Sequence, residues 1–290
     1  MEPDSGFAGP NLAEIDRWNG VGGDTWAALS ERLDAMIEPL GARAMAALGV
    51  GPGERAIDIG CGCGQTTLEL ARRVGDKGRA LGVDVSAQML AVARDRAARA
   101  GLTWASFLKS DAQVHAFEAG GADAVYSRFG VMFFEDPGAA FVNIAAALRP
   151  GGRLAFLCWR AMGENLVMTL PFAAALPHLP ESPPTPDPLA PGPFAFADPA
   201  RVRAILAGAG FEAIDIAPHD QAITSGDLDE TVDTSLRIGP LGTILRENPG
   251  LEGAVVGAIR EALAPFATAQ GVLLNSATWI VTARKGGAAA

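Results

Sequence analysis

The chain has 290 residues, of which 49% are hydrophobic and 19% are charged, a composition that excludes a disordered protein and predicts one large domain with insertions or a cap. The formal net charge at pH 7 is −10, so the protein repels phosphate backbones and we expect no nucleic-acid partner. Three cysteines are too few for a disulfide framework, and Cys61 and Cys63 lack the further ligands of a zinc site, so we expect no metal.

The first residues, Met1 to Gly6, contain neither the basic nor the apolar part of a secretory signal, and no later stretch of 18 residues is apolar and uncharged. We therefore expect a cytoplasmic protein, a monomer or a homodimer, without membrane insertion. Trp18 and Trp26 then precede a helical pattern that includes Leu33 and Ile37.

From Glu54 onward, short apolar runs alternate with longer helical patterns. This alternation is typical of βαβ units around a parallel sheet and predicts an α/β fold. Ser86, Asp136 and Asp198 are expected helix N-caps, and a proline at the first helical position follows the last two. The first six expected strands occupy residues 55–59, 80–85, 104–108, 122–127, 153–159 and 211–216.

Two segments interrupt this alternation. Nine of the 20 prolines lie between Pro177 and Pro199, which predicts a loop or an extended cover. Residues 227–268 have a helical pattern with one apolar face that needs a partner. Because both segments leave the sheet at its carboxyl edge, we expect them to pack together above the crevice and to select the substrate. Residues 277–283 are rich in β-branched and aromatic side chains and predict the last strand.

The strongest motif is the glycine-rich loop at residues 60–64, directly after the first strand. Alternating glycines permit a tight turn and a close approach of the backbone to a nucleotide-like ligand. Gln65 replaces the third glycine of the dinucleotide fingerprint, which disfavours a nicotinamide dehydrogenase. Asp58, Asp84 and Asp111 lie at the carboxyl ends of three successive strands and converge on one crevice, where Asp84 suits a ribose diol and Asp111 an adenine amine. Asp84 and Asp111 each also suit an ordinary turn.

Four segments together resemble the motifs of the class I S-adenosylmethionine-dependent methyltransferases: residues 58–64, 83–86, 109–112 and 148–154. The sequence is most similar to the small-molecule branch related to the ubiquinone and menaquinone C-methylases, the methyltransferase type 11-like proteins. The resemblance is close over residues 50–160 and loose elsewhere. It implies S-adenosyl-L-methionine as cofactor and a doubly wound, seven-stranded, mostly parallel sheet of order 3-2-1-4-5-7-6, with an antiparallel last strand and an added helical and loop cap.

With this resemblance, the chain divides into a lid, a Rossmann-like core and a cap. The N-terminal helical lid is expected at residues 1–48 and would supply aromatic walls that exclude water, although two tryptophans at helical spacing also suit a plain core. The remaining divisions are the cofactor-binding core (49–160), a proline-rich cap segment (161–197), a core helix and strand (198–224), a helical cap insertion (225–270), the last strand (271–285) and a frayed tail (286–290).

The resemblance also implies the cofactor site. Asp84 would hold the ribose, Asp111 the adenine, and the glycine loop would pass beside the methionine moiety. Arg128 alternatively ties strand ends together, because buried charges are generally paired. The residues expected around the cofactor are Asp58, Gly60, Cys61, Gly62, Gly64, Asp84, Val85, Ser86, Met89, Asp111, Ala112, Ser127, Arg128, Phe129, Trp18 and Trp26.

Methyl transfer from a sulfonium is an in-line displacement, so positioning and desolvation of the acceptor come first and a general base is optional. His115 is the best-placed candidate base, although it also suits the border of the adenine site. Trp159, Arg160 and His178 are the candidate substrate contacts, with strand-end packing and a solvated charge as the alternatives for the first two. We expect methyl transfer to a small, partly apolar molecule. A non-catalytic protein that binds the cofactor or its homocysteine product is the alternative.

Overall fold

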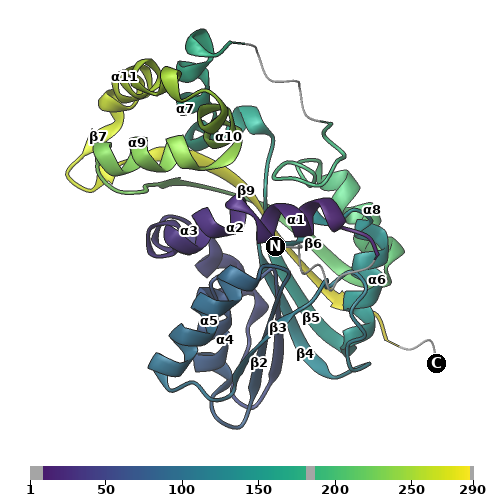
Figure 1. Cartoon of the computed structure of the whole chain (residues 1–290). Coiled ribbons are helices and arrows are strands. Elements are labelled where there is room, and N and C mark those ends of the chain that lie inside the picture. Colours follow the sequence, from purple (N-terminus) through teal and green to yellow (C-terminus); the bar gives the residue numbers. More distant parts are fainter. Residues whose placement is uncertain (1–8, 181–186, 288–290) are drawn as a thin grey trace.

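The computed structural model describes residues 9–180 and 187–287, and its centre is a seven-stranded sheet (Figure 1). The strand order is β3-β2-β1-β4-β5-β9-β6, in which β9 is antiparallel to both neighbours and the other adjacent pairs are parallel. This confirms the predicted fold and order, with β9 as the seventh strand of the sheet. The strands are β1 (Arg55–Ile59), β2 (Arg79–Asp84), β3 (Ala105–Lys109), β4 (Ala122–Arg128), β5 (Leu148–Trp159), β6 (Phe211–Ile223) and β9 (Leu274–Lys285).

The helices fall into three groups. Four follow strands of the core: α4 (Gln65–Val74), α5 (Ala87–Ala100), α6 (Pro137–Ala147) and α8 (Pro199–Gly208). Three form the N-terminal segment: α1 (Leu12–Asn19), α2 (Val21–Ala28) and α3 (Ser30–Leu48). Four lie at one end of the molecule with the hairpin of β7 (Ala267–Thr268) and β8 (Gly271–Val272): α7 (Leu166–Ala175), α9 (Leu228–Arg237), α10 (Gly239–Glu247) and α11 (Glu252–Leu263).

The three expected N-caps are present. Ser86 accepts a hydrogen bond from the backbone N–H of Met89 at the start of α5. The carboxylates of Asp136 and Asp198 cap α6 and α8 in the same way, each ahead of a proline in the first turn. These caps fix where the helices begin and hence where the loops at the carboxyl edge of the sheet lie.

Several elements differ from the sequence expectation, among them β5, which begins at Leu148, five residues before its predicted start. β6 continues seven residues beyond the predicted end, through Pro218, and its place at the edge of the sheet is one that tolerates a proline. α7 forms in the segment between the fifth strand and the proline-rich stretch, where no helix was expected, and it contains Pro171.

The described residues contain two apolar clusters. The larger one surrounds the sheet and includes Leu40, Tyr126 and Phe156. The smaller one lies among α7, α9, α10 and α11, around Val255 and Ile259, so these four helices pack on one another. Figure 1 shows α1–α3 between this helical group and the sheet. No helix among the described residues has the length and apolar character needed to cross a membrane.

Candidate cofactor and substrate site

The glycine loop connects β1 to α4 and packs tightly against its neighbours. Gly60 and Gly64 have φ of +67° and +83°, a conformation that favours glycine. A Cβ on Gly60 would lie 2.7 Å from the Cα of Gly130, and one on Gly64 would lie 2.7 Å from the Cβ of Ala93. The loop therefore approaches both the β4 loop and α5 at distances that only glycine permits.

Asp84 at the end of β2 ties this loop to the start of α5. One carboxylate oxygen accepts a 2.8 Å hydrogen bond from the N–H of Gly62, and the other accepts a 2.8 Å bond from the N–H of Ser86. The side chain is buried, and this desolvation raises its pKa. Each carboxylate oxygen has further lone pairs, so Asp84 can keep both backbone bonds and still accept from hydroxyl groups of a ligand.

Asp58 in β1 is completely buried behind the loop. One oxygen, Oδ2, accepts hydrogen bonds of 2.7 Å and 2.6 Å from the hydroxyls of Thr66 and Thr67. Burial raises the pKa of Asp58 to about 6, although the two hydroxyl bonds lower it. The other oxygen, Oδ1, has no hydrogen-bond partner among the described residues. An unpaired acceptor next to the glycine loop suits an ammonium group, which the amino-acid end of S-adenosylmethionine carries.

The N-terminal segment is bonded directly to the other expected cofactor residues. The side-chain amide of Asn11 donates to Asp111 (2.9 Å) and to Gln113 (3.1 Å). At the other end of α1, the amide of Asn19 donates to the carbonyl of Val85 (3.0 Å) and accepts from the N–H of Ala87 (3.1 Å). α1 therefore lies across the carboxyl ends of β2 and β3.

Trp18 and Trp26 form an edge-to-face pair with ring centroids 5.9 Å apart, and Trp18 makes a similar contact with Phe133. Trp26 also lines a small cavity of about 50 Å³, called the loop cavity here, with Asp34, residues 60–63 and Arg128. Pockets for small molecules commonly measure about 300–1,000 Å³. The loop cavity is smaller than this range, and Trp26 of α2 forms part of its wall.

Arg128 at the end of β4 connects the core to the N-terminal segment. Its guanidinium donates to Asp34 of α3 at 2.7 Å and to the side chain of Gln65 at the start of α4. Asp34 also accepts from Arg96 of α5 at 2.6 Å. Arg128 thus ties strand and helix ends together at the edge of the loop cavity. Sequence reasoning missed Asp34 and the role of Gln65, because nothing in the local pattern marks either residue as a partner of an arginine far along the chain.

The residues after β4 and β5 pack on each other. Ser127 donates to the carbonyl of Ile59 at 2.7 Å. Phe129 has a φ of +62° and stacks on Trp159 with ring centroids 4.1 Å apart. Arg160 bonds to Glu164 and Asp220 and lies over the ring of Trp279.

The two candidate histidines lie apart from each other. His115 follows β3, where its Nδ1 lies 3.1 Å from the hydroxyl of Ser110 and its ring contacts Phe117. His178 is exposed in the turn after α7. The remaining expected cofactor residues lie next to the glycine loop or to the ends of β2 and β3. Cys61, Met89 and Ala112 are buried, and Val85 is half-buried. The roles of all these residues stay predictions.

The comparisons with known proteins agree with this geometry. A family model described as "Methyltransferase domain" matches residues 56–152. Aklanonic acid methyltransferase DauC of Streptomyces sp. (strain C5) is 38% identical over 104 residues, which are 36% of this chain and 47% of that protein. The ubiquinone/menaquinone biosynthesis C-methyltransferase UbiE of Teredinibacter turnerae is 36% identical over 110 residues, 38% of this chain and 44% of that protein. The matches thus span less than half the length of these relatives.

Solved structures show the same fold. The YcgJ protein from Bacillus subtilis superposes with a TM-score of 0.57 at 17% identity, over 84% of this chain and 98% of that one. A phosphoethanolamine N-methyltransferase 2 of Haemonchus contortus, solved with S-adenosyl-L-methionine, has a TM-score of 0.54 at 17% identity over 97% of this chain and 61% of that one. Residues 56–152 therefore form a methyltransferase domain of the class I S-adenosylmethionine-dependent type, and this part of the chain is distantly related to the UbiE enzymes and to natural-product methyltransferases.

Proposed function

We propose that the protein transfers the methyl group of S-adenosylmethionine to a small-molecule acceptor. The observation that carries the proposal is the placement of three acids at the carboxyl edge of the sheet: Asp84 bonds the glycine loop, Asp58 lies behind it, and Asp111 follows the neighbouring strand β3. Carboxylates at the ends of three adjacent parallel strands, two of them next to a glycine-rich turn, suit an adenosyl ligand with a positively charged tail.

Each acid has a separate role in this proposal. Asp84 accepts from the ribose hydroxyls while it keeps its bonds to Gly62 and Ser86. Asp111 accepts from the adenine amine in place of Asn11. The free Oδ1 of Asp58 attracts the ammonium group of the methionine moiety. These contacts orient the cofactor and hold its charged end in a site that excludes water.

The bound cofactor supplies a methyl group already activated by its sulfonium. The protein therefore has to position the acceptor in line and exclude water, and the tryptophans of α1 and α2 suit that task. His115 remains the candidate base for acceptors that must lose a proton, and Trp159, Arg160 and His178 remain candidate substrate contacts. The helices α7 and α9–α11 are proposed to select the acceptor, because they pack as a unit beyond α1–α3.

Isothermal titration calorimetry tests the first half of this proposal. We expect S-adenosylhomocysteine and S-adenosylmethionine to bind with a stoichiometry of one and NAD⁺ not to bind. Binding of NAD⁺ alone would replace methyl transfer with a dehydrogenase function. Binding of S-adenosylhomocysteine without turnover of any acceptor would indicate a non-catalytic binding protein.

A further inference from the structure

A second, larger cavity opens between the N-terminal helices and the helical group beyond them. It measures about 270 Å³ and is called the outer cavity here. α1 and α2 contribute Arg17, Trp18 and Trp26 to its lining, and α9 and α10 contribute Arg237 and Arg246. Its two walls therefore come from segments that are more than two hundred residues apart in the sequence.

Positive charge gathers in the outer cavity although the whole chain is strongly acidic. Three guanidiniums line it, against one carboxylate, that of Asp16. Arg17 and Arg237 are paired with Glu14 and Asp233 on their own helices. Arg246 donates to the hydroxyl of Thr243 and has no carboxylate within ion-pair distance among the described residues, so its charge is available to a ligand.

The start of α10 adds a second feature that favours an anion. Ile238 and Gly239 at this helix N-terminus line the outer cavity, and no side chain caps the helix there. Uncapped N–H groups and the helix dipole favour negative charge at this end. The N-terminus of α10 and the guanidinium of Arg246 therefore both favour an anion in the outer cavity.

The tryptophans supply an apolar wall and a connection to the cofactor side. Trp18 and Trp26 both line the outer cavity, and the guanidinium of Arg17 lies 5.6 Å from the ring centroid of Trp18. Trp26 also lines the loop cavity, together with residues 60–63. Trp26 therefore borders both the outer cavity and the loop cavity.

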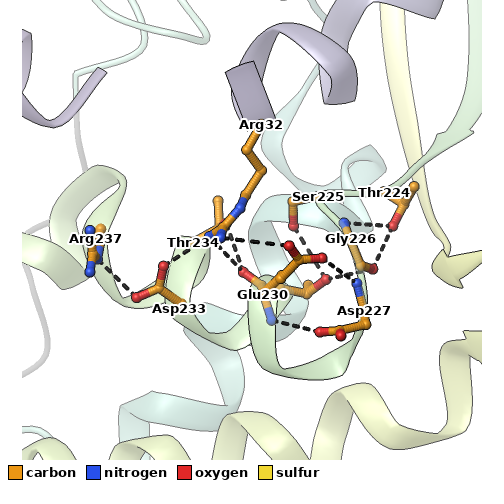
Figure 2. Close-up of polar contacts among 10 residues, drawn as sticks. Arg32, Thr224, Ser225, Gly226, Asp227, Glu230, Asp233, Thr234 and Arg237 are labelled. Carbon is orange, nitrogen blue, oxygen red and sulfur yellow. Dashed lines mark hydrogen bonds and ion pairs between the residues drawn. The ribbon is translucent and has the colours of Figure 1, made fainter. Parts of the chain in front are cut away.

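A network of ion pairs holds Arg237 in place and joins α9 to α3 of the N-terminal segment (Figure 2). Arg32 of α3 donates to Asp233 of α9 at 2.8 Å and to the hydroxyl of Thr234 at 3.2 Å. The other oxygen of Asp233 accepts from Nε of Arg237 at 2.9 Å. The carboxylate of Asp233 therefore holds α9 against α3 through Arg32 and also orients the guanidinium of Arg237, which lines the outer cavity.

We infer that the outer cavity binds an acceptor that has a flat apolar body and an anionic group, a carboxylate or a phosphate. The anionic group lies at Arg237, Arg246 and the start of α10. The apolar body lies along Trp18 and Trp26. The inference rests on the proposed methyl transfer and names the chemical class of its substrate. Arg32 and Asp233 are positioning residues, which act on the ligand through Arg237.

Two fluorescent probes of similar shape test the inference: 1-anilinonaphthalene-8-sulfonate, which is anionic, and N-phenyl-1-naphthylamine, which lacks the sulfonate. Both are titrated into the full chain saturated with S-adenosylhomocysteine. We expect Arg246→Gln to weaken binding of the anionic probe about tenfold and to leave the neutral probe unchanged, because one charge-assisted hydrogen bond is lost. Arg246→Lys should recover most of the affinity.

Arg99→Gln is the matched control, because Arg99 is an exposed arginine of α5 paired with Asp95. It should change neither probe. The inference is overturned if the anionic probe does not bind the wild-type protein at millimolar concentration, if Arg246→Gln affects both probes equally, or if Arg99→Gln has the same effect. Calorimetry with S-adenosylhomocysteine on the same samples separates the two proposals: its failure to bind contradicts the proposed function, whereas an unchanged anionic-probe affinity in Arg246→Gln contradicts the acceptor class.

Discussion

The side-chain amide of Asn11 donates a 2.9 Å hydrogen bond to the carboxylate of Asp111, one hundred residues further along the chain. If Asp111 holds the adenine, as proposed above, the N-terminal segment occupies an acceptor that the cofactor would use. Opening of this segment and binding of the cofactor would then be coupled through one carboxylate.

Replacement of Asn11 tests this coupling. We expect Asn11→Ala to increase the association rate constant of S-adenosylhomocysteine roughly fivefold, because opening no longer breaks a buried hydrogen bond worth about 1 kcal/mol. Stopped-flow tryptophan fluorescence measures the rate. The control is Asn248→Ala, which removes a side-chain amide that bonds only within the distant α10 region. Slower or unchanged association in Asn11→Ala would contradict the coupling.

Asp84→Ala should weaken binding of S-adenosylhomocysteine by about 1–3 kcal/mol, since a charge-assisted bond to the ribose is lost along with the anchor of Gly62. Calorimetry on the folded variant measures the change. Asp76→Ala removes an exposed turn acid and should leave the affinity unchanged. Equal affinities in all three proteins would remove Asp84 from the cofactor site.

The raised pKa of Asp58 predicts a dependence of stability on pH. Because the folded-state pKa of about 6 exceeds the usual aspartate value of 3.8, folding favours the protonated carboxyl. The contribution of Asp58 to stability is complete below pH 4 and is lost as the pH rises through 6. Relative to Asp58→Asn, the free energy of unfolding of the wild type should fall by roughly 2 kcal/mol between pH 4 and pH 7. Urea unfolding of both proteins measures the difference, and parallel pH profiles would contradict the prediction.

The same carboxyl makes cofactor affinity depend on pH. An ammonium group next to Oδ1 stabilises the ionised form of Asp58, so S-adenosylhomocysteine should bind more tightly at pH 7 than at pH 5. In Asp58→Asn this increase should disappear. Calorimetry at the two pH values measures it, and an equal increase in both proteins would assign the effect to another group.

Arg32→Gln removes the contacts between α3 and α9. We expect hydrogen exchange of the backbone amides of residues 228–237 to accelerate about tenfold, because α9 loses its ion pair and hydrogen bonds to the N-terminal segment. Arg72→Gln, which removes an exposed arginine of α4, is the control and should leave α9 unchanged. If the backbone amides of α9 exchange at the same rate in both variants, Arg32 does not hold α9 against α3.

Most of the sheet followed from local patterns, because β1 to β4 are short apolar runs bounded by turn residues and the helices α5, α6 and α8 each begin at a capping side chain. The segment 227–268 was less well predicted: it contains three main helices rather than one long pattern, since Pro240 and Pro249 with their neighbouring glycines start new helical segments. These prolines and glycines are visible in the sequence, but the prediction gave more weight to the apolar periodicity of the segment.

Most of the candidate site depends on contacts that no local pattern encodes. Asn11 and Asp111 are one hundred residues apart, and Asp34 meets Arg128 across 94 residues. Gln65 was noticed only as a missing glycine, whereas its side chain bonds Arg128. Motifs located the cofactor edge of the sheet because they fix the backbone, but the partners of the side chains depend on how the N-terminal helices pack.

The most direct test of methyl transfer is incubation of the protein with S-adenosylmethionine labelled in its methyl group and a library of small metabolites. Labelled small molecule and S-adenosylhomocysteine should form in equal amounts, and Asp84→Ala should reduce both together. A protein that binds S-adenosylhomocysteine but transfers no label to any metabolite would contradict the proposed activity and indicate a binding protein.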